Sequence, residues 1–338
     1  MNQIKFFDST LRDGSHAVKH QISLESITEY CKRVDGSGLY VVTVGHGNGL
    51  GASTLQVGLS ANVDLEMIKT ARKVLHKTKL GAFLIPGFGT IKDDLAPAID
   101  AGADVVCVAA HCTEADVTRQ HVEYVISRSK EAYGVLMMYH MASKERLLEE
   151  AKKMESYGVM GIILMDSAGS STPVMVKDVI FHLNSNLKVP VGFHAHNNLS
   201  MAVSNSLTAI ESGAAIIDGT TRGFGAGAGN CQLEALLALM QKSGMETGVD
   251  LYKILDASEE VVKQMMAKPQ ETDSVSIVSG LAGVFSGFSP HVRKAAEKFG
   301  VDPRDIFMEL GKRKVVAGQE DFIVEAAEEL AKNKENNI

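Results

Sequence analysis

Two kinds of segment alternate along the chain up to about residue 245. Short runs such as "VVCVAA" (105–110) and "IILMD" (162–166) are apolar at nearly every position. The longer runs between them repeat apolar residues at helical spacing, and several end in Gly, where a helix C-cap is expected. Because continuous apolar runs are typical of strands that are buried on both faces, this pattern predicts a parallel sheet covered by helices.

Eight such strand–helix units fit between residue 4 and about residue 240. Alternating strands and helices indicate an α/β fold, and eight units of roughly 25–35 residues favour a closed (β/α)8 TIM barrel. An open doubly wound sheet is the alternative. The pattern predicts strands at residues 4–8, 39–44, 80–85, 104–109, 134–139, 161–165, 189–196 and 215–219.

The pattern becomes helical beyond residue 245, in segments such as "DLYKILDASEEVVKQMM" and "SPHVRKAAEKFG". This stretch is too long to be a single closing helix. We therefore predict two domains, a TIM-barrel catalytic domain at residues 1–245 and a C-terminal helical domain at residues 246–338.

Charge and composition narrow the classes of partner. The chain of 338 residues has 45% hydrophobic residues and a formal net charge of -7, with no basic cluster that would follow a phosphate backbone, so we expect no nucleic acid partner. No apolar run approaches the roughly 20 residues that span a bilayer, and the N-terminus lacks a signal-peptide pattern. We expect no membrane association and a cytoplasmic location.

Polar residues gather directly after the predicted strands. In a TIM barrel the chemistry belongs to these loops, which share one rim. Seven of the eight segments contain His, Asp or Arg: "DSTLRDGSH", "GHGNGLG", "PGFGT", "HCTEAD", "HMAS", "DSAGS", "HAHNN" and "TTRGFGAGAGN". The sequence therefore predicts an active site at this rim.

His194 and His196, in "FHAHNN", are two residues apart on the seventh predicted strand, so their side chains point the same way. A third ligand would be a carboxylate, and Asp8 and Asp13 on or after the nearby first strand are the candidates. Two imidazoles and one carboxylate suit a divalent ion such as Mn²⁺ with positions left open for substrate oxygens. A polar rim pair without metal is the alternative.

Other chemistries are disfavoured by position. Metal-dependent hydrolases that use two histidines in this spacing carry them on the first strand, whereas here they lie on the seventh. Schiff-base aldolases need a lysine at a strand end, but Lys5 and Lys79 lie at or before the starts of their strands. The glycine-rich "GFGAGAGN" could bind phosphate, but a tight turn that brings Asn230 near the metal is favoured.

The segments "FFDSTLRDGSH", "FHAHNN" and "GAGAGN" resemble the metal-dependent DRE-TIM barrel superfamily. It includes isopropylmalate synthases, hydroxymethylglutaryl-CoA lyases and 4-hydroxy-2-oxovalerate aldolases. Within it, His16 favours the aldolase branch, because the acyl-CoA enzymes usually have Gln there. The segments "GHGNGLG", "AAHCTEADV" and "ELGKRKVVAGQEDFIVEAA" also resemble the aldolases, so the similarity covers nearly the whole chain.

The resemblance implies a class II aldolase that cleaves 4-hydroxy-2-oxoacids of the 4-hydroxy-2-oxopentanoate type to pyruvate and a short aldehyde. Its implied metal is Mn²⁺, with Co²⁺ or Mg²⁺ as substitutes, bound by Asp13, His194 and His196. Asn230 would contact these ligands without binding the metal itself. The first two ligands, Asp13 and His194, would also contact the substrate.

The resemblance further implies roles for residues around the metal. Arg12 would stabilise the enolate, Ser167 would contact substrate, and His16 would be the general base. An imidazole has an unperturbed pKa near 6.5 and can accept the 4-hydroxyl proton at neutral pH. Without the resemblance, Arg12 and Asp13 could be a surface ion pair, His16 an exposed loop residue and Ser167 a helix cap.

Two positions depart from the aldolase pattern. Phe285, a candidate substrate contact in "GLAGVFSGFSP", replaces a usual Tyr, which removes a hydroxyl donor beside the pocket. Its loss affects stereochemical control and aldehyde preference more than bond cleavage. Asn48, in "GHGNGLG", replaces a usual Asp, with no expected consequence that we can name.

The C-terminal domain of such aldolases docks an acylating aldehyde dehydrogenase, and the resemblance implies such a partner for this chain. If that partner does not exist, the domain would serve self-association. We also expect an oligomeric assembly. Two rival functions remain open. One is an acyl-CoA condensing or cleaving enzyme of the same superfamily. The other is a catalytically silent subunit that scaffolds a dehydrogenase.

Overall fold

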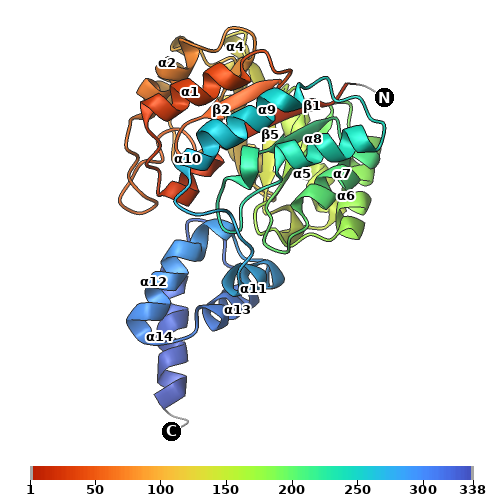
Figure 1. Cartoon of the computed structure of the whole chain (residues 1–338). Helices are drawn as coiled ribbons and strands as arrows, with labels where there is room; N and C mark the ends of the chain where they lie inside the picture. The colour runs from red at the N-terminus through yellow and green to blue at the C-terminus, as the bar shows by residue number, and fades with distance from the viewer. Residues whose placement is uncertain (1–2, 336–338) are drawn as a thin grey trace.

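Eight parallel strands close into a barrel in the computed structural model, which describes residues 3–335 (Figure 1). Each strand pairs with the next in sequence, and β8 pairs with β1. The strands are β1 (Lys5–Leu11), β2 (Val41–Val44), β3 (Lys79–Leu84), β4 (Val105–His111), β5 (Glu131–Met137), β6 (Ile162–Asp166), β7 (Val191–Ala195) and β8 (Ile216–Gly219). The predicted TIM barrel is confirmed, and the pairing of β8 with β1 excludes the open sheet.

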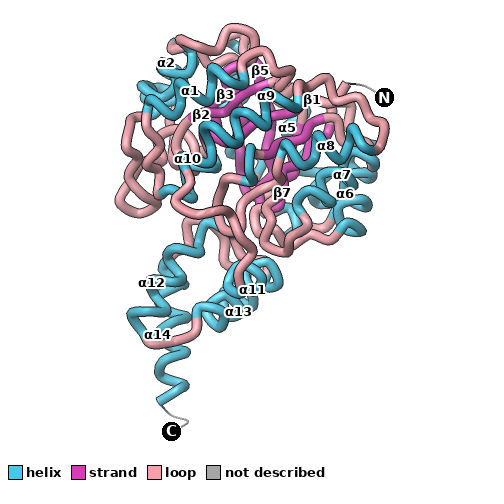
Figure 2. The backbone as a smooth tube through the Cα atoms, in the orientation of Figure 1, coloured by secondary structure: helices cyan, strands magenta, loops and turns pink. Residues whose placement is uncertain are grey.

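Helices surround the strands, as Figure 2 shows. Three of them begin after a hydroxyl side chain that accepts a backbone N–H: Ser23 before α1, Ser143 before α5 and Thr172 before α6. The helices of this layer are α1 (Leu24–Val34), α2 (Asp64–Arg72), α3 (Ala96–Asp100), α4 (Arg119–Ser127), α5 (Lys144–Ser156), α6 (Pro173–Asn186), α7 (Ala202–Glu211) and α8 (Leu233–Lys242).

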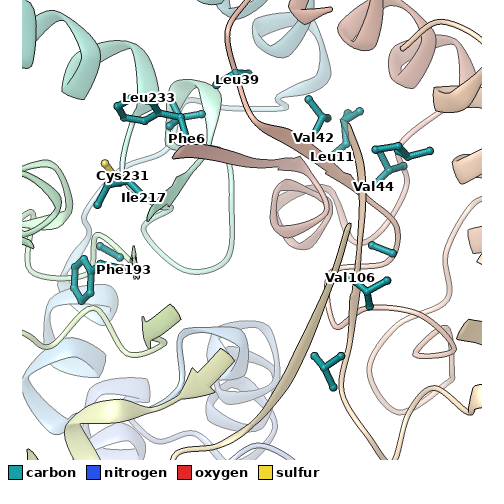
Figure 3. Close-up of a cluster of buried hydrophobic side chains, with 14 of the residues drawn as sticks. Phe6, Leu11, Leu39, Val42, Val44, Val106, Phe193, Ile217, Cys231 and Leu233 are labelled. Carbon is teal, nitrogen blue, oxygen red and sulfur yellow. The ribbon is translucent and has the colours of Figure 1, made fainter. Parts of the chain in front are cut away.

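The strands are mostly apolar because both of their faces are buried, and their polar residues, such as Asp8 in β1 and His194 in β7, are buried as well. In β1, Phe7 belongs to a cluster that fills the barrel, whereas the neighbouring Phe6 belongs to the larger cluster between strands and helices. Figure 3 shows part of this outer layer, in which Phe6, Val42 and Val106 lie with other buried apolar side chains. Because each strand lies between these two apolar layers, polar and apolar residues do not alternate regularly along its sequence.

The last helices form a separate lobe that projects from the barrel (Figure 1). They are α11 (Ser274–Ala282), α12 (Ser289–Phe299), α13 (Pro303–Arg313) and α14 (Asp321–Glu335), and they share a core that includes Val275, Phe288 and Phe307. None of the helices within residues 3–335 is long and apolar enough to cross a membrane.

The division between the lobes lies later in the chain than the predicted boundary at residue 245. Helices α9 (Leu251–Ala257) and α10 (Lys263–Met265) follow α8, and Ile254 and Val262 belong to the barrel core. The second core begins at Val275. These two short helices were predicted to belong to the C-terminal domain because a helical pattern in the sequence does not reveal what the helix packs against.

A buried polar network ties β1 to α1 on the outside of the barrel. The Tyr30 hydroxyl donates to Asp8 Oδ2 at 2.6 Å and lies 2.6 Å from Thr221 Oγ1. The backbone N–H of Thr10 donates to Asp8 Oδ1 at 2.9 Å. Burial raises the pKa of Asp8 to about 6, so its ionised form depends on these donors.

We predict that Tyr30→Phe lowers the free energy of unfolding by about 1–3 kcal/mol, because it leaves a buried carboxyl group without one donor. Urea denaturation near pH 7.5 measures the change. Tyr252→Phe is the matched control, since the Tyr252 side chain is exposed on α9. Equal stability of the two variants would contradict the prediction.

Candidate metal centre

Asp13, His194 and His196 meet at the rim where the strands end. One ligand atom from each side chain lies within 4.8 Å of the others, and all three residues are buried. His194 is in β7, His196 follows it and forms an isolated bridge with Asn230, and Asp13 begins the turn after β1. Among the described residues, this is the one group of three or more His, Cys, Asp or Glu side chains with such spacing.

The free nitrogens of this group fit a divalent cation. His194 Nε2 and His196 Nδ1 are both buried and have no hydrogen-bond partner within the described structure. Buried polar atoms without a partner are rare in folded proteins, so each calls for an explanation. Two imidazole nitrogens and one carboxylate form a donor set that binds divalent metal ions and leaves positions open. These side chains can therefore hold such an ion.

Asp218 orients His194. His194 Nδ1 lies 2.9 Å from Asp218 Oδ2, and Ser9 Oγ donates to Asp218 Oδ1 at 2.8 Å. A carboxylate behind an imidazole fixes which ring nitrogen is free for a metal. Asp218 was not among the predicted site residues, although a single acidic residue inside the apolar strand "IIDG" was a usable signal.

Three donors hold the Asp13 carboxylate. Arg12 Nη1 donates to Oδ1 at 2.8 Å, while Asn230 Nδ2 and the backbone N–H of Ala226 donate to Oδ2 at 2.6 Å and 3.2 Å. Burial acts to raise the pKa of Asp13, but the positive charge of Arg12 and the nearby imidazoles hold that pKa well below its usual range. Asp13 is therefore ionised and able to bind a cation.

The glycine-rich loop lies directly against this carboxylate. A Cβ atom at Gly225 would overlap Asn230 Nδ2 and Asp13 Oδ2. Glycine at this position lets the backbone approach the site closely. The contact supports the structural role of the loop that the sequence favoured over phosphate binding.

Arg12 is fixed on several sides. Its guanidinium group lies 4.4 Å from the centre of the Phe83 ring, and Nη1 donates to the Gly47 carbonyl at 3.3 Å. Nη2 lies 4.0 Å from Asp218 Oδ2. Arg12 is thus a buried cation between two carboxylates and not part of a surface ion pair.

A single inner cavity brings most of the predicted site residues together. Its lining includes Arg12, Asp13, His16, Asn48, His196 and Phe285. Ala317 and Gly318 of the C-terminal lobe also line it. The two domains therefore enclose one site.

His16 stands at the edge of this cavity beside two further histidines. Burial lowers the pKa of His16 to about 4, so the imidazole is neutral near pH 7. Its ring lies 4.9 Å from that of His20, which stacks at 3.7 Å on His46. His20 is anchored by Ser15 Oγ at 3.0 Å and by the Val57 carbonyl at 3.1 Å. His20 and His46 were not among the predicted site residues, although the segments "HAVKH" and "GHG" contain them.

Two predicted candidates lie elsewhere. Asp8 contacts Thr10 and Tyr30 and is absent from the metal group, because successive side chains in β1 face opposite sides. Ser167 Oγ accepts the backbone N–H of Met138 at 3.1 Å, and Ser167 does not line the cavity. Its backbone carbonyl accepts the N–H of Ser286 at 3.0 Å, so Ser167 supports the turn that carries Phe285.

A parallel barrel with two histidines and an aspartate facing one another at this rim defines a class of metal-binding barrel proteins. Residues 3–261 match the HMGL-like family, and residues 270–332 match the DmpG-like communication domain. A 4-hydroxy-2-oxovalerate aldolase of Pectobacterium atrosepticum is 54% identical over 99% of this chain and 98% of its own length. The 4-hydroxy-2-oxovalerate aldolase of Spirochaeta aurantia is 53% identical over 96% of this chain and 95% of its own length. The chain belongs to the HMGL-like family and, within it, to the 4-hydroxy-2-oxovalerate aldolases.

The barrel also resembles a distant structure. The carboxyl transferase domain of Rhizobium etli pyruvate carboxylase superposes with a TM-score of 0.82 over 98% of this chain and 61% of that chain. The two sequences are 14% identical, so the likeness concerns the fold alone.

We predict that Asp218→Asn weakens binding of a divalent ion about 10- to 100-fold, because His194 loses the carboxylate that orients its ring. Calorimetric titration of chelator-treated protein with Mn²⁺ measures the affinity. Asp178→Asn on the exposed face of α6 is the control, since it removes a carboxylate far from the site. Unchanged Mn²⁺ affinity in Asp218→Asn would show that Asp218 does not orient His194 for metal binding.

Proposed function

We propose that this chain is a class II aldolase that uses Mn²⁺ to cleave 4-hydroxy-2-oxopentanoate, or a close homologue, to pyruvate and a short aldehyde. The observation that carries the proposal is one cavity lined by a neutral imidazole, a buried guanidinium group and two of three candidate metal ligands. Relatives named 4-hydroxy-2-oxovalerate aldolase over nearly the full length support the reaction type, a carbon–carbon lyase.

The metal would be held by Asp13, His194 and His196. When bound there, a divalent ion acts as a Lewis acid on a 2-oxoacid substrate. A mixed nitrogen and oxygen donor set suits Mn²⁺, and Co²⁺ or Mg²⁺ could replace it. Asn230 keeps Asp13 in place through the hydrogen bond to its second carboxylate oxygen.

The protein side chains would perform the proton transfer and the charge stabilisation. Neutral His16 accepts the proton of the 4-hydroxyl group while the C3–C4 bond breaks and an aldehyde carbonyl forms at C4. The electron pair of that bond remains on the C3 side as the pyruvate enolate. Arg12 donates hydrogen bonds to the enolate oxygen. The proton that His16 accepted is then returned, directly or through water, to C3, which gives pyruvate and restores the neutral imidazole.

Phe285 would contact the aldehyde portion of the substrate. Its ring lines the cavity and packs edge-on against Phe288 at 5.5 Å. Phenylalanine offers apolar surface and no donor, so the side chain would favour an alkyl group over an oriented hydroxyl. We therefore propose that this position affects aldehyde preference more than bond cleavage.

An acylating aldehyde dehydrogenase is the proposed partner of the C-terminal lobe. The match to a communication domain over residues 270–332 supports this proposal. The lobe also exposes apolar side chains that a partner could cover, namely Ile277, Leu281, Met308 and Val324. Assembly into an oligomer stays a prediction from the sequence.

A product assay tests the function. Protein incubated with 4-hydroxy-2-oxopentanoate and Mn²⁺ is expected to release pyruvate and acetaldehyde in equal amounts. If the protein releases no pyruvate from the 2-oxoacid but cleaves an acyl-CoA substrate, the result would favour an acyl-CoA condensing or cleaving enzyme. A metal-loaded protein that turns over no 2-oxoacid would favour the silent scaffold.

We predict that His16→Gln lowers kcat/KM about 10²- to 10⁴-fold while the protein still binds its metal, because glutamine cannot accept the hydroxyl proton. Steady-state pyruvate release and metal analysis of the same sample provide the two readouts. His76→Gln is the control, since His76 is an exposed histidine far from the cavity. Unaltered turnover in His16→Gln would exclude it as the base.

The lowered pKa of His16 predicts an unusual pH dependence. An imidazole with a pKa of about 4 stays unprotonated as the pH falls, so activity that needs the neutral ring persists well below 6.5. We expect kcat/KM to stay nearly level between about pH 5.5 and pH 7 and to fall only at lower pH. Metal content measured at each pH separates base protonation from metal loss. An acid limb centred near pH 6.5 at constant metal content would contradict the expectation.

A further inference from the structure

A second cavity of about 430 Å³ opens outside His16. It lies between the barrel rim and the C-terminal lobe, with the turn after β1 and residues 55–58 on one side and the start of α12 on the other. The glycine-rich loop, at Phe224 to Gly227, forms part of its wall. Of its lining residues, only His16 has a proposed catalytic role, and Gly225 and Ala226 contact Asp13 through their backbone.

The outer cavity adjoins the inner one. His16, Val57 and Ala226 line both of them, so these three residues form the partition between the two spaces. Phe285, Ala317 and Gly318 of the C-terminal lobe also line the inner cavity. A molecule that reaches His16 from solvent on the outer side therefore passes through the 430 Å³ space.

The outer cavity is lined by cationic side chains. Lys19, Lys268 and Arg293 line it together with the imidazoles of His16, His20 and His291, and its lining contains no Asp or Glu. This is a local excess of positive charge in a chain with a formal net charge of -7. Fields of this kind raise the local concentration of ligands of opposite charge.

Two of the three cations are partly neutralised just outside the cavity. Arg293 pairs with Asp273 at 2.5 Å, and Lys268 pairs with Glu271 at 2.6 Å. Lys19 has no ion-pair partner among residues 3–335 and is exposed. It also lies three residues after His16, at the end of the same turn. The uncompensated charge of the cavity is therefore concentrated at Lys19.

We propose that the outer cavity is the entrance for 2-oxoacid substrates, and that Lys19 attracts their carboxylate group on the way to His16. The inference rests on the proposed aldolase function and extends it to how an anion is captured. Lys19 then acts on binding and not on bond cleavage. A neutral aldehyde gains nothing from this charge.

The reverse reaction tests a charged and a neutral substrate, pyruvate and acetaldehyde, in one assay. In the addition of pyruvate to acetaldehyde, Lys19→Glu is expected to raise the KM for pyruvate roughly fourfold at low ionic strength, as expected for a reversed charge at about 10 Å in water. The KM for acetaldehyde and kcat should stay within about twofold. At about 0.5 M salt the difference for pyruvate should disappear.

Three variants serve as controls. Lys19→Arg keeps the charge and should match the wild type, and Lys152→Glu makes the same change of net charge at an exposed position of α5. Ala17→Trp narrows the cavity at an exposed lining position and should lower kcat/KM, whereas Ala238→Trp, exposed on α8, should not.

The outcomes distinguish the two proposals. Suppose that the wild type makes and cleaves the 2-oxoacid, but Lys19→Glu and Lys152→Glu have the same KM for pyruvate at low salt. The proposed entrance is then wrong, and the aldolase function stands. Should the wild type show no turnover, the function fails. The entrance is then judged by calorimetric binding of pyruvate to metal-loaded protein, where equal affinity of wild type and Lys19→Glu would overturn it.

Discussion

The parallel pairing of β8 with β1 is the contact on which the site depends. It aligns Phe7 with Asp218 and Asp8 with Gly219, and it closes the barrel. Closure brings the turn after the first strand beside the end of the seventh, so Asp13 meets two histidines about 180 residues later in the chain. In an open sheet in which each strand paired only with the next, β1 and β8 would lie at opposite edges.

Charge balance explains why the buried groups at this rim tolerate one another. Arg12 is the single permanent cation between the carboxylates of Asp13 and Asp218, and the imidazoles of His194 and His196 keep free nitrogens toward the same point. Buried carboxylates are costly unless a cation compensates them. A divalent ion bound there would coordinate the carboxylate and both nitrogens at once.

The C-terminal lobe contributes to the site as well as to the proposed docking surface. Phe285, Ala317 and Gly318 reach the inner cavity, and Gln56 Nε2 donates to Glu320 Oε2 at 3.1 Å across the two domains. A site enclosed by both domains couples the chemistry at the rim to the position of the lobe. The outer cavity adjoins the inner one at His16, Val57 and Ala226, and residues of the C-terminal lobe line both.

The sequence by itself determined the barrel, because eight apolar runs at regular spacing have few other ways to be buried. Side-chain alternation and the position at a strand end also singled out His194 and His196, with Asp8 and Asp13 as alternative partners. The choice of Asp13 and the roles of Arg12 and His16 came from the resemblance to the aldolases. Only the tertiary structure decided that Asp218 orients His194, that Asp8 faces Tyr30, that Ser167 lies behind the cavity, and that α9 packs on the barrel. These facts depend on which surfaces distant segments present to one another, and a linear pattern records the tendency of a segment to be buried but not the partner that buries it.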